Sequence, residues 1–197
     1  MPKIAAANIE EHIRIQEMRI LDAARDLFTT RGYRDTDMAD IARSMGLARN
    51  SLYRYYSNKD HILVAVVKRD MVPFFAQLDE IEKRVADPVE RIDAWIGLQM
   101  EIAAGPCDAM TRMLGEIPPN ASELRKEITA LHEPPSRVLL NAVCQLLEGS
   151  GRDAQLIAAM ISSMVQSAAG IAIQTKHGDA CVEELQRSVS RILTSGQ

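Results

Sequence analysis

Apolar residues recur along this chain at the three- and four-residue intervals of an α-helix. Ile20, Leu21, Ala24, Leu27 and Phe28, for example, fall on one side of a helix. No stretch alternates apolar and polar residues as a half-buried strand does. The pattern predicts a loose arm at residues 1–8, followed by helices at about residues 10–30, 37–45, 48–56, 57–84, 87–104, 107–115, 120–132, 134–149, 153–176 and 180–193.

Single residues mark several of the helix ends. Gly32 follows the first helix as a C′ residue, where glycine is favoured. Thr36 or Asp37 can cap the second helix, and Ser57 can cap the fourth, with an acidic residue three positions later. Pro134-Pro135 predicts a break and a new helix, because proline is tolerated only in the first turn.

Composition supports the same fold class. The 197 residues are 47% apolar and 25% charged but only 4% aromatic, and Ala and Met are plentiful. Strands favour aromatic and β-branched residues, whereas Ala, Leu, Met and Glu favour helices. The chain is therefore predicted to be a globular all-α protein of one domain, or of two small ones.

The sequence contains no familiar catalytic or metal-binding motif. Cys107, Cys144 and Cys181 are odd in number and far apart, which argues against a disulfide framework and against a cysteine zinc site. The four histidines show no HExxH spacing, and GxSxG, P-loop and GxGxxG patterns are absent. We therefore expect a cytoplasmic protein that is not an enzyme and has no cofactor or metal.

Residues 154–175 form an uncharged segment that is long enough to span a bilayer. Three Gln and three Ser residues interrupt it, and no Trp or Tyr flanks it. We interpret it as a helix buried against protein on most sides, without contact to a membrane.

Charge is distributed unevenly. Residues 1–70 hold 12 basic and 10 acidic residues, whereas residues 71–197 hold 11 and 17. Ile41 to Lys59 contains Arg43, Arg49 and Arg54 and no acidic residue. This local basic patch favours contact with a polyanion at one place, although a solvated helix face would have the same composition.

The patch coincides with two short helices, 37–45 and 48–56, that are joined by a tight turn containing Gly46. This spacing is typical of a helix-turn-helix, whose second helix presents its N-terminal residues to base edges in the major groove of DNA. Those residues are Arg49, Asn50 and Ser51; Arg suits guanine and Asn suits adenine. Tyr53, Arg54, Tyr55 and Lys59 follow as candidate donors to phosphate oxygens.

Residues 20–63, ILDAARDLFTTRGYRDTDMADIARSMGLARNSLYRYYSNKDHIL, resemble the DNA-binding domain of TetR-type transcriptional regulators. The resemblance rests on Ile20, Ala24, Leu27, Phe28, Gly32, Tyr33, Thr36, Ile41, Ala42, Gly46, Leu52, Tyr53, Tyr56, Lys59 and Leu63 at the family's spacing.

The resemblance implies an N-terminal helix-turn-helix domain at residues 1–58. A long helix would join it to a helical ligand-binding and dimerisation domain, so that the second domain spans residues 59–197. It also implies base contacts from Arg49, Asn50 and Ser51, and phosphate contacts from Tyr53, Tyr55, Lys59 and the segment around Thr36. Ala48 departs from the family, because a serine often caps the recognition helix there.

The C-terminal part offers a candidate ligand pocket. Met and Trp side chains adapt to apolar ligands, and we expect such an effector to contact Trp95, Gln99, Met100, Met110 and Met113. Each of these residues could equally belong to the hydrophobic core. Arg112, Glu116 and His132 are further candidates for polar anchors.

The last two helices are predicted to form a dimer interface. Val182, Leu185, Val189 and Ile192 repeat at the 3-4-3 spacing of a helix seam. Ser163 and Ser167 belong to a row of small residues that allows close approach of two helices. The alternative is that both helices pack only within one chain.

We therefore expect a homodimer that binds a palindromic double-stranded DNA operator, and the resemblance implies a repressor that a small, mainly apolar effector releases. An alternative is a helix-turn-helix protein without such an effector, controlled by a protein partner.

Overall fold

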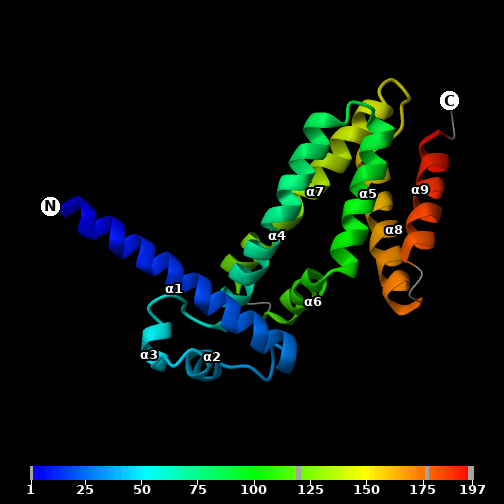
Figure 1. Ribbon diagram of the computed structural model, residues 1–197. Helices are drawn as coiled ribbons and strands as arrows, with labels where there is room; N and C mark the ends of the chain where they lie inside the picture. Colours follow the sequence, from blue (N-terminus) through cyan, green and yellow to red (C-terminus); the bar gives the residue numbers. More distant parts are fainter. Residues whose placement is uncertain (1, 119–120, 176–177, 195–197) are drawn as a thin grey trace. The chain divides into compact units, whose positions relative to one another are not determined.

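The computed structural model describes residues 2–118, 121–175 and 178–194, and no strand occurs in these three ranges. The helices are α1 (Pro2–Arg31), α2 (Met38–Ser44), α3 (Arg49–Leu52), α4 (Lys59–Arg84), α5 (Pro88–Ala104), α6 (Pro106–Met113), the 3₁₀ turn η1 (Leu114–Glu116), α7 (Ser122–Leu146), α8 (Ala154–Thr175) and α9 (Gly178–Thr194) (Figure 1). The predicted all-α fold is confirmed.

The chain divides into two compact units. The first contains Met1–Asp70 and Ala109–Ile128, and the second contains Met71–Asp108 and Thr129–Gln197. The predicted boundary between residues 58 and 59 falls inside the first unit. These units are defined by packing contacts, so the predicted limits of the two functional domains stay a prediction.

The first unit is built around α1, α2, α3 and the start of α4. Its fully buried apolar side chains include Ile20, Phe28, Ile41, Leu52 and Leu63 from these four helices. Two ion pairs also join α1 to α4, Arg25 to Asp70 at 2.8 Å and Arg69 to Asp22 at 2.7 Å. These contacts fix the scaffold that carries α2 and α3.

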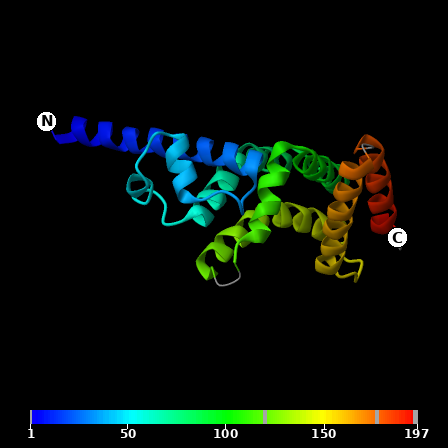
Figure 2. The ribbon, with the colours of Figure 1, turned by 90° about the horizontal axis from the view of Figure 1, so that it is seen from below.

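The second unit has a larger core, to which α4, α5, α7, α8 and α9 contribute. Within it, α8 and α9 lie side by side in both Figure 1 and Figure 2, and both pack on α5. Arg152 donates to the carbonyl oxygens of Ile192 and Leu193, and so caps the last turn of α9. The α8–α9 pair is therefore held by its packing on α5 and by the hydrogen bonds from Arg152 to the end of α9.

Three predictions about local structure were wrong. Residues 2–8 are helical, because Pro2 suits a first helical position and three alanines follow. Pro134 and Pro135 lie inside a single helix α7, where buried Val138, Leu139, Ala142 and Val143 hold its second half in the core. Asn58, not Ser57, caps α4: its Oδ1 accepts from the backbone N–H of His61 at 3.1 Å.

Two other helices differ in extent or burial from the prediction. Helix α3 covers only Arg49–Leu52, and the backbone continues to Tyr56 as hydrogen-bonded turns. Helix α8 is long and apolar enough to cross a membrane by length and composition alone, which is weak evidence for a span. It is buried along one face only, and not on most sides as predicted. The predicted loop at Pro118-Pro119-Asn120 and turn at His177 fall largely outside the described residues.

Candidate DNA-binding site

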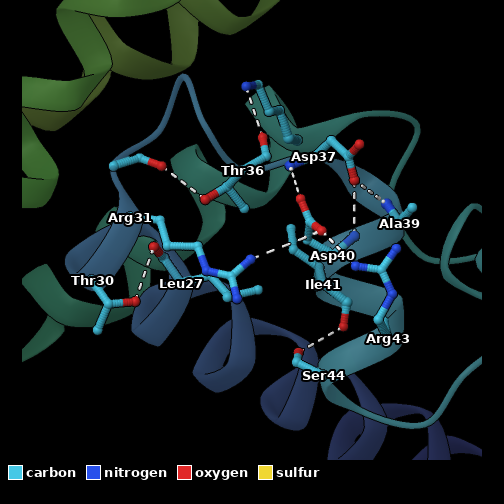
Figure 3. A network of polar contacts seen from close by, with 12 residues as sticks. Leu27, Thr30, Arg31, Thr36, Asp37, Ala39, Asp40, Ile41, Arg43 and Ser44 are labelled. Atoms are coloured by element: carbon cyan, nitrogen blue, oxygen red, sulfur yellow. Dashed lines mark hydrogen bonds and ion pairs between the residues drawn. The ribbon is translucent and has the colours of Figure 1, made fainter.

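The first helix of the helix-turn-helix begins with a complete capping box (Figure 3). The Asp37 carboxylate accepts from the backbone N–H of Ala39 at 2.7 Å and of Asp40 at 2.8 Å. In return, the Asp40 carboxylate accepts from the backbone N–H of Asp37 at 3.1 Å. These bonds hold the pKa of Asp37 below its usual value, with the N–H of Asp40 as the main cause. The cap that was predicted from sequence at this position is therefore ionised at neutral pH.

Asp40 also connects α2 to its neighbours (Figure 3). Its Oδ1 accepts from Arg43 at 2.8 Å on the same helix and lies 4.0 Å from a guanidinium nitrogen of Arg31 at the end of α1. The half-buried carboxylate of Asp40 thus orients the start of α2 and links α2 to α1.

The turn between the two helices depends on Gly46. Its φ is +67°, in the left-handed region, and its N–H donates to the carbonyl of Arg43. Ala48 then begins α3 in an extended conformation and makes no side-chain cap, as its identity predicted. Leu52 is completely buried and anchors α3 from below.

The start of α3 presents the predicted base-contacting residues. Arg49 and Asn50 are exposed and Ser51 is half-buried. The guanidinium of Arg49 donates to the hydroxyl of Tyr53 at 2.9 Å and lies 5.5 Å from the centre of its ring. Tyr53 is 41% exposed, so it restrains Arg49 without covering it. An oriented arginine beside a free asparagine can read a purine-containing base step.

The tyrosines after α3 differ in burial. Tyr55 and Tyr56 are half-buried, whereas Tyr53 is exposed. Burial raises the pKa of the Tyr56 phenol, which keeps its hydroxyl protonated near neutral pH. Tyr53 is exposed and Tyr55 is partly exposed, which is compatible with phosphate contacts, but the role of both tyrosines stays a prediction.

Lys59 does not present a free ammonium to DNA. Its Nζ donates to the carbonyl oxygens of Tyr33 at 2.6 Å, Arg34 at 3.3 Å and Thr36 at 2.9 Å, and it lies 4.3 Å from the centre of the Tyr33 ring. Lysine has three N–H donors, and all three are used. The predicted phosphate contact by Lys59 conflicts with this geometry, because the ammonium binds the α1–α2 loop of its own chain.

The side chain of Thr36 is also unavailable. It is 0% exposed, and its hydroxyl donates to the carbonyl of Gly32 at 2.8 Å. This hydroxyl closes the loop after α1, so a direct phosphate contact by the Thr36 side chain conflicts with the geometry. The contact predicted for the segment around Thr36 stays a prediction.

Sequence reasoning missed the role of Tyr33 and Asp60. The Tyr33 hydroxyl donates to the Asp60 carboxylate at 2.5 Å, and burial together with this bond raises the pKa of Tyr33 far above its usual value. With Lys59, these residues join the α1–α2 loop to the first turn of α4. The only sequence signal was the adjacent opposite charges of Lys59 and Asp60 at the start of a helix.

The five predicted pocket residues do not share one compact unit. Trp95, Gln99 and Met100 lie on α5 in the second unit, whereas Met110 and Met113 on α6 belong to the first. Trp95 is 3% exposed, and its indole N–H donates to the carbonyl of Pro135 at 2.8 Å. The Nε2 of Gln99 is buried and makes no hydrogen bond in the described part of the chain.

The predicted interface residues fall into three groups by burial. Leu185 and Val189 are 6% and 1% exposed inside the core of their own chain, so their predicted place at an interface is wrong. Val182 and Ile192 are half-buried. Ser163 and Ser167 are exposed on α8, on the same outward face as Leu156, Met160 and Ile171.

Comparisons with known proteins identify relatives among bacterial transcriptional regulators. Residues 20–66 match the family described as bacterial regulatory proteins, tetR family. The fatty acid metabolism regulator protein of Bacillus subtilis is 28% identical over 114 residues, which span 58% of this chain and 59% of that protein. A transcriptional repressor of Mycobacterium tuberculosis is 24% identical over 198 residues, covering 85% of this chain and 98% of the repressor.

A solved structure agrees over a longer range. The crystal structure of the regulator FadR from Bacillus subtilis in complex with stearoyl-CoA has a TM-score of 0.70 and 25% identity, over 91% of this chain and 98% of that one. The match covers the helix-turn-helix and the helices that follow it. Residues 20–66 therefore match the tetR family of bacterial regulatory proteins, and the chain resembles transcriptional regulators along most of its length.

Proposed function

We propose that this protein is a cytoplasmic repressor that binds a palindromic DNA operator as a homodimer and leaves it when a small, mainly apolar effector binds. The observation that carries the DNA-binding part is the exposed Arg49–Asn50 pair at the start of α3, on a helix anchored by the buried Leu52. A regulator needs side chains that reach base edges from a rigid support, and this pair meets that requirement.

The outward face of α8 supports the dimer. It combines exposed apolar side chains with small ones, namely Leu156, Ala159, Met160, Ser163, Ser167, Gly170 and Ile171. Large apolar side chains that stay exposed in one chain favour burial against another, and small residues allow two helices to approach. A second copy of α8 on this face would place two recognition helices on one DNA site with two-fold symmetry.

The second unit supports an effector that is mainly apolar. Trp95 and Met100 lie on α5 in the core of this unit, and the buried Nε2 of Gln99 between them in sequence makes no hydrogen bond within the described residues. An apolar ligand with one polar group would satisfy that amide and bury its own chain. The stearoyl-CoA held by the Bacillus subtilis regulator, a relative at 25% identity, carries a long apolar chain.

Selection of bound duplexes from a random library tests this function. We expect a palindrome to be enriched, with light scattering showing a dimer in solution. Failure to enrich any sequence would contradict the proposal. A thermal-shift screen of small molecules tests the effector, because a ligand that binds the folded state raises the melting temperature. If operator binding changed only in the presence of a protein partner, the alternative would hold, namely a helix-turn-helix protein that is regulated by that partner and has no small-molecule effector.

A further inference from the structure

The second unit contains a groove between α5, α8 and α9. Its volume is about 740 Å³, within the range of sites that hold drug-sized ligands. Its wall is mostly small or apolar and consists of Gly97, Met100, Ala103, Ala104, Ala169, Ala172, Ile173, Gly178 and Val182. Small residues create the space, because a Cβ added to Gly97 would meet no atom within 4 Å.

Three carboxylates complete the lining. Glu101 on α5 and Asp179 and Glu183 on α9 are exposed at this groove. None of them makes an ion pair or hydrogen bond in the part of the chain that the structure describes, and no Lys, Arg or His is among the described lining residues. Within residues 2–118, 121–175 and 178–194, the groove therefore combines apolar walls with three carboxylates that have no ion-pair partner.

We propose that this groove binds an amphipathic cation, a molecule with an apolar body and one positively charged amine or quaternary ammonium group. The apolar body would pack against Met100, Ala172 and Val182, and the cation would lie among the carboxylates. Opposite charge at short range is favourable, whereas the phosphates of a coenzyme A ester would be repelled at this groove. The occupant thus differs in charge from the ligand of the Bacillus subtilis relative.

Helix α8 gives such a ligand a route to DNA binding, and this step rests on the proposed function. Ala169, Ala172 and Ile173 line the groove, while Ser167 and Ile171 of the same helix lie on the outward face proposed for the dimer. A ligand that favours one position of α8 would change the spacing of the two recognition helices. A two-fold operator tolerates only a narrow range of half-site spacings.

The binding test uses three probes with one chain length: octyltrimethylammonium, octanol and octanoate. The fluorescence of Trp95, the one tryptophan in the sequence and two residues before the lining residue Gly97 on α5, reports binding together with calorimetry. We expect the cation to bind more tightly than octanol, and octanoate least tightly. Glu101→Gln and Glu183→Gln should each weaken the cation about threefold, and the double variant about tenfold, with octanol unchanged.

Two further variants control for charge and space. Glu148→Gln removes an exposed, unpaired carboxylate from the loop after α7, outside the groove, and should leave cation binding unchanged. Gly97→Leu adds a side chain to the groove wall, at a position where a Cβ meets no atom within 4 Å, and should abolish binding of all three probes. The proposal would be overturned if the cation and octanol bound equally well. It would also be overturned if Glu148→Gln weakened cation binding as much as Glu101→Gln or Glu183→Gln. A change of oligomeric state in Gly97→Leu would assign the groove to a second copy of the chain instead.

Operator binding is then measured separately. A fall in operator affinity with octyltrimethylammonium, lost in the double variant, supports the cation as effector; selective binding without that fall overturns the effector role. Because probe binding needs no DNA, failure of the groove proposal leaves a dimeric operator-binding protein intact, and failure of operator selection leaves the probe result intact.

Discussion

The ammonium of Lys59 lies 2.9 Å from the carbonyl oxygen of Thr36, across the junction between the α1–α2 loop and α4. Thr36 directly precedes the cap of α2, so this bond connects the start of the helix-turn-helix to the helix that follows it. Two further carbonyls accept from the same ammonium. The contact makes Lys59 a positioning residue, with consequences that can be measured.

Lys59→Met should lower the free energy of unfolding by about 1–3 kcal/mol, since hydrogen bonds to a charged group are lost. DNA affinity should fall, but the dependence of log affinity on log salt should keep its slope, because no phosphate contact disappears. Chemical denaturation and DNA titrations at several salt concentrations measure both. Lys126→Met, at an exposed lysine of α7, is the control for lost charge and should preserve stability. Unchanged stability with a slope smaller by about 0.9 would instead identify Lys59 as a phosphate contact.

Local sequence rules predicted the parts of this site that depend on near neighbours. The Asp37 cap of α2 and the turn at Gly46 each depend on residues within a few positions of one another. The Lys59 contacts join residues 23 to 26 positions apart and depend on how α4 packs, so spacing could not reveal them. Pro134-Pro135 shows the opposite case, where tertiary packing overrides a local rule.

Arg49→Ala should cost about 1–3 kcal/mol of operator affinity and relax the preference at one base position. Tyr53→Phe keeps the ring but removes the hydroxyl that accepts from Arg49 at 2.9 Å, so we expect a smaller loss at the same base position. Fluorescence anisotropy with single-base operator variants measures both effects. Arg191→Ala, at an exposed position of α9, controls for net charge and should change neither the operator affinity nor the base preference. Uniform weakening on every sequence would show that Arg49 contacts the backbone of DNA.

Asp37→Ala should lower the free energy of unfolding by about 1 kcal/mol at pH 7, whereas Asp37→Asn should retain most of the cap. Because backbone N–H groups hold the pKa of Asp37 below its ordinary 3.8, the carboxylate's contribution is present above about pH 4 and is lost as the pH falls through the lower folded value. Urea denaturation at pH 7 and in acid should show the wild type losing its advantage over Asp37→Asn. Asp35→Ala, at an exposed position before the cap, is the matched control. An advantage that persists in acid would contradict this account of the cap.

The outward face of α8 makes the prediction with the largest structural effect. Ser167→Arg places a long charged side chain where the proposed dimer requires two helices in close contact, so the protein should become monomeric at micromolar concentration. The side chain of Ser167 is exposed in the single chain, so the variant should retain its helical circular dichroism and its own core. Operator affinity should then fall steeply, because a lone helix-turn-helix reads one half-site only. Light scattering measures the mass. Ser122→Arg, at the exposed start of α7, adds the same charge away from α8 and should remain a dimer. A dimeric Ser167→Arg protein with normal operator affinity would place the interface on another surface and leave the exposed Leu156, Met160 and Ile171 without the role proposed for them.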